Sequence, residues 1–294
     1  MSRTEQRTAC GDDRERSRFR RPLPTALSNV EGDECMTADM HEHFSSVASR
    51  YRDLRTTDPE PIAHIARQLR LVSKITAADV GCGSGRYNRL LFQYLGKKLE
   101  RLYCLDASHA MLDQVRNYLK LHGIERLQVI RSAARNLPFA SGHLDCAFTF
   151  NAIHHFDARR FLREVARVLT RQGHLFIYTR FREQNSRNIW GEYFPLFCEK
   201  ETRLYELNDF ERMVEANAEL RIADIALFEY PRSSTLQKLV ELARNHHYST
   251  FCLYTESEFR ESLTRFENNI RESFEDPENV SWNDENALLT FNRF

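Results

Sequence analysis

A glycine-rich segment follows the first strongly apolar run of the chain and reads ADVGCGSGRY over 78–87. Gly81, Gly83 and Gly85 let the chain turn tightly and let a ligand touch the backbone where a Cβ would block it. The spacing is G-x-G-x-G, whereas dinucleotide sites need G-x-G-x-x-G to seat a pyrophosphate on a helix N-terminus. Asp79, two residues before the first glycine, suits a cationic or amine-bearing ligand. The segment therefore argues against a dinucleotide.

Three later apolar runs are also followed by residues that suit a ligand site. Asp106 ends the run over 99–105, where a carboxylate can accept hydrogen bonds from both ribose hydroxyls of an adenosine. The segment AARNLPF (133–139) follows the run over 127–130, and NAIHHF (151–156) follows the run over 144–150. Ligands of an open α/β sheet bind beyond the carboxyl ends of its strands. We therefore expect these segments to meet at one site.

The spacing of apolar residues predicts the elements that hold these segments. We expect strands over 75–80, 99–105, 127–130, 144–150, 174–178, 220–228 and 287–291. We expect helices over 41–54, from Pro61 onward, and over 88–95, 108–122, 159–169, 208–216 and much of 234–274, with a loop and a short helix over 180–203. This alternation predicts a Rossmann-like, doubly wound α/β sheet of about seven strands, mostly parallel with an antiparallel last strand, plus a helical cover.

The amino-terminal segment differs in composition from the rest. Residues 1 to about 35 carry almost no periodic apolar side chains, so we predict a disordered tail there and one folded domain over 36–294. Its basic stretch RSRFRR (16–21) could contact a nucleic acid, although such stretches are more often solvated. Met36 and Met40 are alternative starts. A helical insertion at about 234–275 is expected to cover the substrate.

The charge balance and the positions of the cysteines limit the classes of protein to which this chain can belong. Lys+Arg and Asp+Glu both number 42, and this balance counts mildly against a large phosphate-tracking surface. None of the seven cysteines forms a C-x-x-C pair, so neither a zinc site nor a full disulfide set is indicated. No run is apolar enough to span a membrane, and no signal peptide is evident. We expect a cytoplasmic protein without a metal.

Five motifs, in order, resemble those of a known family. The segments DVGCGSG, LDAS, NLPF, LDCAF and REVARVLTRQGHLFIY are similar to class I S-adenosylmethionine-dependent methyltransferases, of the type 11 group that includes ubiquinone and menaquinone methyltransferases. The resemblance covers about residues 44 to 180. It implies that S-adenosyl-L-methionine is the cofactor.

The resemblance also implies roles for single residues. Gly81, Gly83 and Gly85 would line the methionine part of the cofactor, Asp79 would hold the glycine loop and help the amino group, and Asp106 would bind the ribose. The adenine would lie near Ala107, Ala133 and Ala134, Asn151 would lie near the methyl donor, and Tyr51 would close over the cofactor. The family usually has an acid where Ala133 stands, which leaves the contact to the adenine amino group open.

The methyl acceptor is the least determined part of the site. His154 and His155 could deprotonate an oxygen or nitrogen nucleophile near neutral pH, or could simply pack and bond the loop. Aromatic and basic residues farther along suggest a flat or anionic acceptor; these are Arg180, Trp190, Tyr193, Phe194, His246, His247 and Tyr248.

We expect methyl transfer to O, N or C of a small organic molecule. One alternative is a tRNA methyltransferase of the wobble-uridine type, since GCGSGRY and AIHHF also resemble that group. Another is a non-catalytic cofactor-binding protein, and an NAD oxidoreductase is disfavoured by the glycine spacing.

Overall fold

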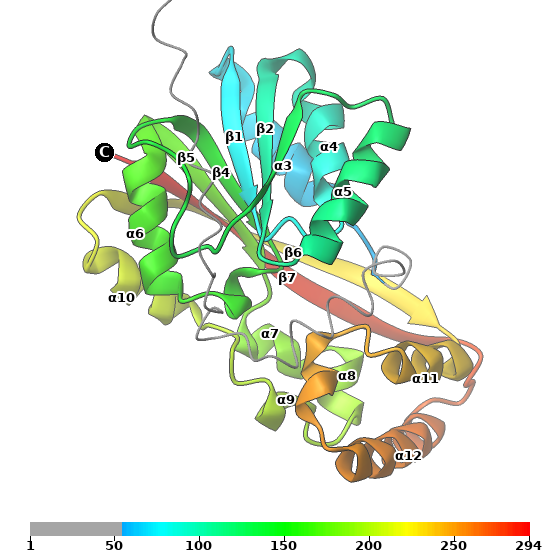
Figure 1. The fold of residues 1–294 in the computed structure, drawn as a ribbon. Helices are drawn as coiled ribbons and strands as arrows, with labels where there is room; N and C mark the ends of the chain where they lie inside the picture. The colour runs from blue at the N-terminus through cyan, green and yellow to red at the C-terminus, as the bar shows by residue number, and fades with distance from the viewer. Residues whose placement is uncertain (1–54) are drawn as a thin grey trace, which may run out of the picture. The chain divides into compact units, whose positions relative to one another are not determined.

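The computed structural model describes residues 55–294, and its helices and strands are labelled here as in Figure 1. The predicted tail over 1–35, the start positions Met36 and Met40, the helix expected over 41–54 and Tyr51 lie outside the described residues.

Seven strands form one sheet in the order β3-β2-β1-β4-β5-β7-β6. β1 pairs in parallel with β2 and β4, whereas β7 runs antiparallel to both of its neighbours, β5 and β6. The predicted doubly wound sheet with an antiparallel last strand is thereby confirmed. The strands are β1 (Ile75–Val80), β2 (Leu99–Asp106), β3 (Leu127–Arg131), β4 (Leu144–Phe150), β5 (Leu169–Thr179), β6 (Leu220–Ser234) and β7 (Val280–Arg293).

Helices cover both faces of the sheet because side chains of a strand alternate between its faces. Ile75 and Ala77 of β1 pack with α3 (Glu60–Gln68), α4 (Arg86–Leu95) and α5 (His109–Leu121). Ala78 and Val80 pack with α6 (Ala158–Val168) and α10 (Leu207–Glu215) on the other face. Short 3-10 turns complete this part, namely η2 (Leu69–Leu71), η3 (Gly96–Lys98) and η4 (Ile153–His155).

A second group of helices lies away from the sheet, at the lower end of Figure 1. It comprises α7 (Arg182–Ser186), α8 (Ile189–Tyr193), α9 (Phe197–Lys200), α11 (Leu236–Arg244), η5 (Ser249–Leu253) and α12 (Glu256–Ser273). α8, α9, α11, η5 and α12 share one hydrophobic cluster centred on aromatic rings, in which Trp190 stacks on Phe266 at 5.2 Å. In the chain, α11 and α12 lie between β6 and β7, so these two strands connect both helices to the sheet.

The last two strands are longer than the sequence predicts. β6 continues beyond residue 228 to Ser234, and β7 begins at Val280 rather than at residue 287. β5 pairs with β7 only as far as Ala287, so the outer halves of β6 and β7 pair with each other alone. We call this two-stranded extension, residues 228–234 and 280–286, the arm. The sequence does not predict this extension because its residues are polar and include Pro231. Proline argues against a central strand, although it is tolerated in an edge strand such as β6.

Two smaller expectations also need correction. β5 begins at Leu169 instead of residue 174, because the strand continues through a bulge in which Gln172 has φ +68°. The segment over 180–203 holds three short helices, not one, and Asn188 caps α8 by accepting from the N–H of Trp190 at 2.8 Å. Such short, locally capped turns leave no periodic pattern long enough to read from sequence.

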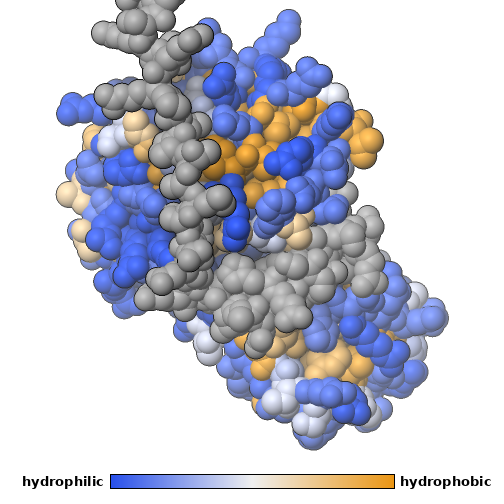
Figure 2. All heavy atoms as spheres, in the orientation of Figure 1, coloured by the Kyte–Doolittle hydropathy of each residue, from blue (hydrophilic) through white to orange (hydrophobic). Residues whose placement is uncertain are grey.

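β3 is an edge strand, and its side chains Leu127 and Val129 are only half-buried. Figure 2 shows hydrophobic surface at this end of the molecule, between hydrophilic helices. Of the described helices, none combines the length and the apolar character that crossing a membrane requires.

Arg167 fastens the 133–139 segment to α6. Its guanidinium donates to the carbonyl oxygens of Phe139 (2.7 Å) and Leu137 (3.0 Å), while Glu164 accepts from the Leu137 N–H at 2.8 Å. Arg167→Ala is therefore expected to lower the free energy of unfolding by about 1–3 kcal/mol. Thermal unfolding followed by circular dichroism measures it. Arg163→Ala, at an exposed position of the same helix, is the control, and equal losses for both variants would contradict this role.

Candidate functional site

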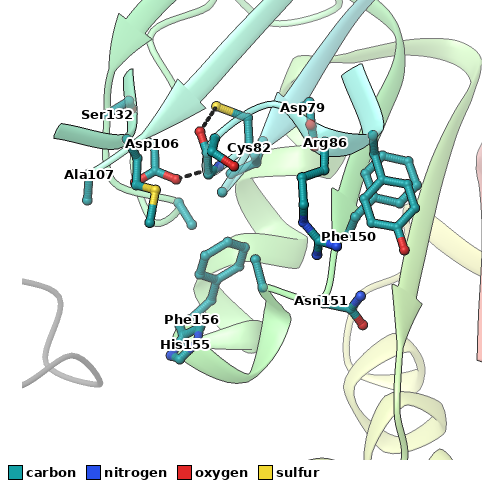
Figure 3. A pocket seen from close by; sticks show the side chains of 18 residues that line it. Asp79, Cys82, Arg86, Asp106, Ala107, Ser132, Phe150, Asn151, His155 and Phe156 are labelled. Carbon is teal, nitrogen blue, oxygen red and sulfur yellow. Dashed lines mark hydrogen bonds between the residues drawn. The ribbon is translucent and has the colours of Figure 1, made fainter. Parts of the chain in front are cut away.

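A cavity of about 80 Å³ lies at the carboxyl ends of β1, β2 and β4 (Figure 3). It brings together most of the residues predicted to bind the cofactor, namely Asp79, Gly81, Gly83, Asp106, Ala107, Ala134, Asn151 and the predicted catalytic His155. Gly85 and Ala133 are not among its lining residues, and His154 lines a neighbouring cavity.

The glycine loop needs glycine at two positions because of packing. Gly81 has φ +71°, and a Cβ there would lie 2.7 Å from the Ala152 Cβ. Gly85 has φ +84° as the N-cap of α4, and its Cβ would lie 2.5 Å from Cγ2 of Val115. Distances this short exclude any side chain without movement of the neighbours. Gly85 thus lets α4 and α5 approach each other and acts on the cavity only by placing the loop.

Gly83 is different, because it has φ +53° but a Cβ added there would meet no protein atom within 4 Å. Its backbone therefore borders open space of the cavity. The Gly83 N–H donates to Oδ2 of Asp106 at 2.9 Å, and Oδ1 of Asp106 accepts from the Ser108 N–H at 2.8 Å. Asp106 thus fixes the loop and the start of α5 at once. Ser108 is the N-cap of α5, and its side chain accepts from the Met111 N–H.

Asp79 is a buried carboxylate, only 1% exposed, at the end of β1. Its Oδ2 accepts from Nδ2 of Asn88 at 2.7 Å, whereas its Oδ1 has no hydrogen-bond partner among the described residues. Burial raises the pKa of Asp79 to about 7, against the lowering effect of the Asn88 hydrogen bond, and the charge of Asp106 adds to the rise. A bound cation is the partner that would relieve this arrangement.

These features fit the amino-acid end of S-adenosylmethionine. Its ammonium group can supply the cation that the Asp79 carboxylate lacks, and the open backbone at Gly83 allows the close approach that the methionine part requires. Figure 3 shows Asp106, Ala107 and Ser132 on one side of the cavity and Phe150 and Asn151 on the other. A ligand with an adenosine at one end and an amino acid at the other matches this elongated arrangement.

Asn151 stands where the first cavity meets a second one. It has φ +53°, unusual for a residue with a side chain, and its N–H donates to the Tyr178 carbonyl at 2.7 Å. Such backbone strain concentrates at functional sites. Tyr87, Asn151 and His155 line both cavities, so these three residues form the junction between them.

The second cavity measures about 260 Å³ and is lined by side chains from the sheet, the arm and the second group of helices. Four residues predicted to surround the acceptor line it, namely Arg180, Trp190, His247 and Tyr248. Tyr193, Phe194 and His246 are not among its lining residues; Phe194, 2% exposed, is part of the aromatic cluster.

His154 and His155 lie in η4, directly after β4, with ring centroids 4.1 Å apart. Burial lowers the pKa of His154 well below its usual value, and the positive charges of Arg203 and Arg55 lower it further. Its imidazole is therefore neutral at physiological pH and able to accept a hydrogen bond.

Sequence reasoning missed several lining residues. In the first cavity, Arg86 and Tyr87 follow the glycine loop directly, so their position at the start of α4 was a usable signal. In the second, Asp58 and Arg232 form an ion pair across 174 residues, with Arg232 Nη2 2.7 and 2.8 Å from the two carboxylate oxygens. No local pattern predicts such a pair.

Comparisons with known proteins identify the kind of domain. Residues 78–177 match the family model described as "Methyltransferase domain". The chain is 29% identical over 182 residues to mouse tRNA (carboxymethyluridine(34)-5-O)-methyltransferase ALKBH8, covering 60% of this chain and 25% of the relative. It is 25% identical to the uncharacterized methyltransferase YcgJ of Bacillus subtilis, covering 48% of this chain and 55% of the relative. The chain thus spans a quarter to about half of these curated relatives.

Solved structures share the fold. The crystal structure of YcgJ superimposes with a TM-score of 0.58 at 18% identity, over 80% of this chain and 98% of that one. That of the [4+2]-cyclase SpnF gives a TM-score of 0.53 at 16% identity, over 80% of each chain.

The family match over residues 78–177 and the fold define the class of this region, which is a methyltransferase domain of the class I, S-adenosylmethionine-dependent type; the cofactor of that class is S-adenosyl-L-methionine.

Proposed function

We propose that this protein transfers the methyl group of S-adenosylmethionine to a small organic acceptor bound in the second cavity. The observation that carries the proposal is the junction at Tyr87, Asn151 and His155, which joins a cavity suited to the cofactor to a separate, larger one. A cavity of about 260 Å³ is close to the ~300–1,000 Å³ of small-molecule sites.

In this proposal the loop residues hold the cofactor as the fold suggests. Asp79 binds the ammonium group, Gly81 and Gly83 line the methionine part, with Gly85 placing the loop, and Asp106 binds the ribose hydroxyls. Ala107 and the Ala133–Ala134 backbone flank the adenine, and Asn151 lies beside the methyl donor. Tyr51, predicted to close over the cofactor, belongs to the same proposal.

The chain's own contribution to catalysis is mainly alignment. When bound, the cofactor supplies a methyl carbon on a sulfonium, and transfer forms the carbon–acceptor bond as the carbon–sulfur bond breaks, with its electron pair left on sulfur. Holding the acceptor in line at the junction is worth up to ~7–11 kcal/mol of the barrier. His155 at the junction and the neutral His154 beside it are placed to take the acceptor's proton where the acceptor carries one.

Isothermal titration calorimetry with S-adenosylhomocysteine tests the cofactor half, and release of S-adenosylhomocysteine from S-adenosylmethionine in a small-molecule pool tests turnover. We expect binding, and turnover that falls at least tenfold in a His154→Gln, His155→Gln double variant while cofactor affinity stays within about threefold. Absence of binding would reject the proposal. Binding without turnover on any acceptor would instead support a non-catalytic role, and the cyclase structure shows that this fold is not limited to one reaction.

A tRNA acceptor is the second candidate, favoured by the likeness to the mouse tRNA methyltransferase. Binding to bulk tRNA that weakens steeply with salt, together with methyl transfer to it, would favour this candidate over the small molecule. Absence of tRNA binding would reject the tRNA candidate.

A further inference from the structure

The charged side chains of the second cavity indicate what kind of acceptor it takes, an inference that rests on the proposed function. Three carboxylates line this cavity, Asp58, Glu201 and Asp284, together with three guanidinium groups, Arg55, Arg180 and Arg232. Whether the cavity attracts a cation, an anion or a neutral molecule depends on which of these charges are already paired within the protein.

All three carboxylates are paired. Asp58 accepts from Arg232 at 2.7 and 2.8 Å, and Asp284 accepts from Arg180 at 3.0 Å. Arg232 Nε also approaches the second oxygen of Asp284 at 3.4 Å, which links both pairs into one network between the arm and residues outside it, Asp58 and Arg180.

The third carboxylate, Glu201, is paired just as closely. It accepts from Nε of Arg203 at 2.8 Å, from a second nitrogen of the same guanidinium, and from the Thr250 hydroxyl at 2.6 Å. The Arg203 pair lowers the pKa of Glu201 despite its burial, so this group is ionised and satisfied. Among residues 55–294, the cavity therefore offers no free carboxylate to a cationic acceptor.

Arg55 is the guanidinium without such a partner. It donates from Nη1 to the carbonyl oxygen of His247 at 3.1 Å, and its guanidinium carbon lies 4.1 Å from the centre of the Tyr248 ring. Both partners are uncharged, and no carboxylate among residues 55–294 pairs with Arg55. Of the five N–H donors of Arg55, one is used within residues 55–294, and the others face no hydrogen-bond partner among these residues, so they are available to a ligand.

The setting of Arg55 also orients it. A guanidinium that lies over a tyrosine ring loses part of its side-chain freedom, and its planar fork can then bind an anionic oxygen group through two N–H donors. Arg180 approaches the same ring at 5.8 Å, so Tyr248 lies between two positive charges. A neutral acceptor would leave the positive charge of Arg55 partly removed from water and uncompensated, which costs free energy.

We infer that the second cavity selects an acceptor that carries an anionic oxygen group, a carboxylate or a phosphate, which Arg55 binds while the reacting atom lies toward Asn151 and His155. The ring of Tyr248 holds Arg55 in place, and the Asp58–Arg232–Asp284–Arg180 network keeps the remaining charges neutral as a group. Specificity for the acceptor thus resides in Arg55, away from the residues proposed to hold the cofactor.

The test uses the full chain saturated with S-adenosylhomocysteine and titrated calorimetrically with three probes of similar shape. Benzoate and phenyl phosphate distinguish a carboxylate from a phosphate preference, and benzamide is the neutral control. We expect one or both anions to bind at least tenfold more tightly than benzamide. Arg55→Gln should remove this preference, a loss of about tenfold or more, and Arg55→Lys should retain part of it.

Arg67→Gln, at an exposed position of α3, makes the same change of net charge and should leave all three affinities unchanged. Equal binding of benzamide and both anions, no binding of either anion at millimolar concentration, or an unchanged preference in Arg55→Gln would each overturn the inference. Normal S-adenosylhomocysteine affinity in these samples would show that the cofactor half of the proposed function still stands, whereas its absence in the wild type would reject that function itself.

Discussion

Asp79→Asn is expected to weaken S-adenosylhomocysteine binding about 30-fold or more at pH 8, because loss of a buried ionic partner costs about 2–5 kcal/mol. The carboxylate is 1% exposed and has one oxygen without a hydrogen-bond partner among the described residues. Calorimetry measures the change. Asp113→Asn, an exposed carboxylate on α5 paired with Arg116 and His109, is the charge-matched control and should bind normally.

The pH dependence of S-adenosylhomocysteine affinity provides a second test of Asp79. The pKa of Asp79 is about 7, so below pH 7 the wild-type site must lose a proton before it can hold a cation. Affinity should therefore fall by up to tenfold per unit as the pH drops below 7, and should stay flat in Asp79→Asn. A flat profile in the wild type would contradict the role of this carboxylate.

Stability should change in the opposite sense. Because the folded-state pKa lies above the usual value of 3.8, the folded protein binds the extra proton between pH 4 and 7 and loses stability as the pH rises through that window. The Asp79→Asn variant cannot ionise at this position and does not lose stability in this way. The melting temperature of the variant minus that of the wild type should therefore increase between pH 5 and pH 8, even though the variant binds the cofactor poorly.

Gly83→Ala should lower cofactor affinity at least tenfold, whereas the protein should still fold with a modestly lower melting temperature. The added Cβ would meet no protein atom within 4 Å and would instead occupy cavity space against the backbone. Strain at its φ of +53° costs about 1–2 kcal/mol.

Gly123→Ala is the matched control, since Gly123 also has a left-handed φ, +66°, and open space, but it follows α5 outside the cavity. Both variants should unfold at similarly reduced temperatures, while only Gly83→Ala loses S-adenosylhomocysteine affinity. Equal affinities would show that the ligand does not approach the backbone at Gly83.

The sheet centre could be predicted from sequence because its strands are buried on both faces and read as continuous apolar runs. β1 and β4 have the predicted bounds, and Asp79, Asp106 and Asn151 lie at one cavity because parallel strands end at one edge. The residues of this edge are close in sequence to the strands that place them.

The second cavity could not be predicted in the same way. Arg55, Glu201, Arg232 and Asp284 reach it from four separate parts of the chain, and the arm that carries two of them is polar and contains Pro231. Burial alternates along the arm, but the more buried face includes Arg232 and Ser234, so hydropathy does not alternate with it and the sequence pattern does not reveal the strand. Tertiary contacts, not local propensity, keep it extended.

The arm contributes residues to the second cavity and none to the first. Arg232 pairs with Trp282 and Tyr230 with Asp284 in the β6–β7 register, so these four side chains share one face of the ribbon. A one-residue insertion between Phe228 and Arg232 would turn Arg232 to the other face, whereas substitutions at these alternate positions alter only what the ribbon presents. If the proposed function holds, substitutions on this face would change acceptor preference one position at a time without touching Asp79, Gly83 and Asp106, the residues proposed to hold the cofactor.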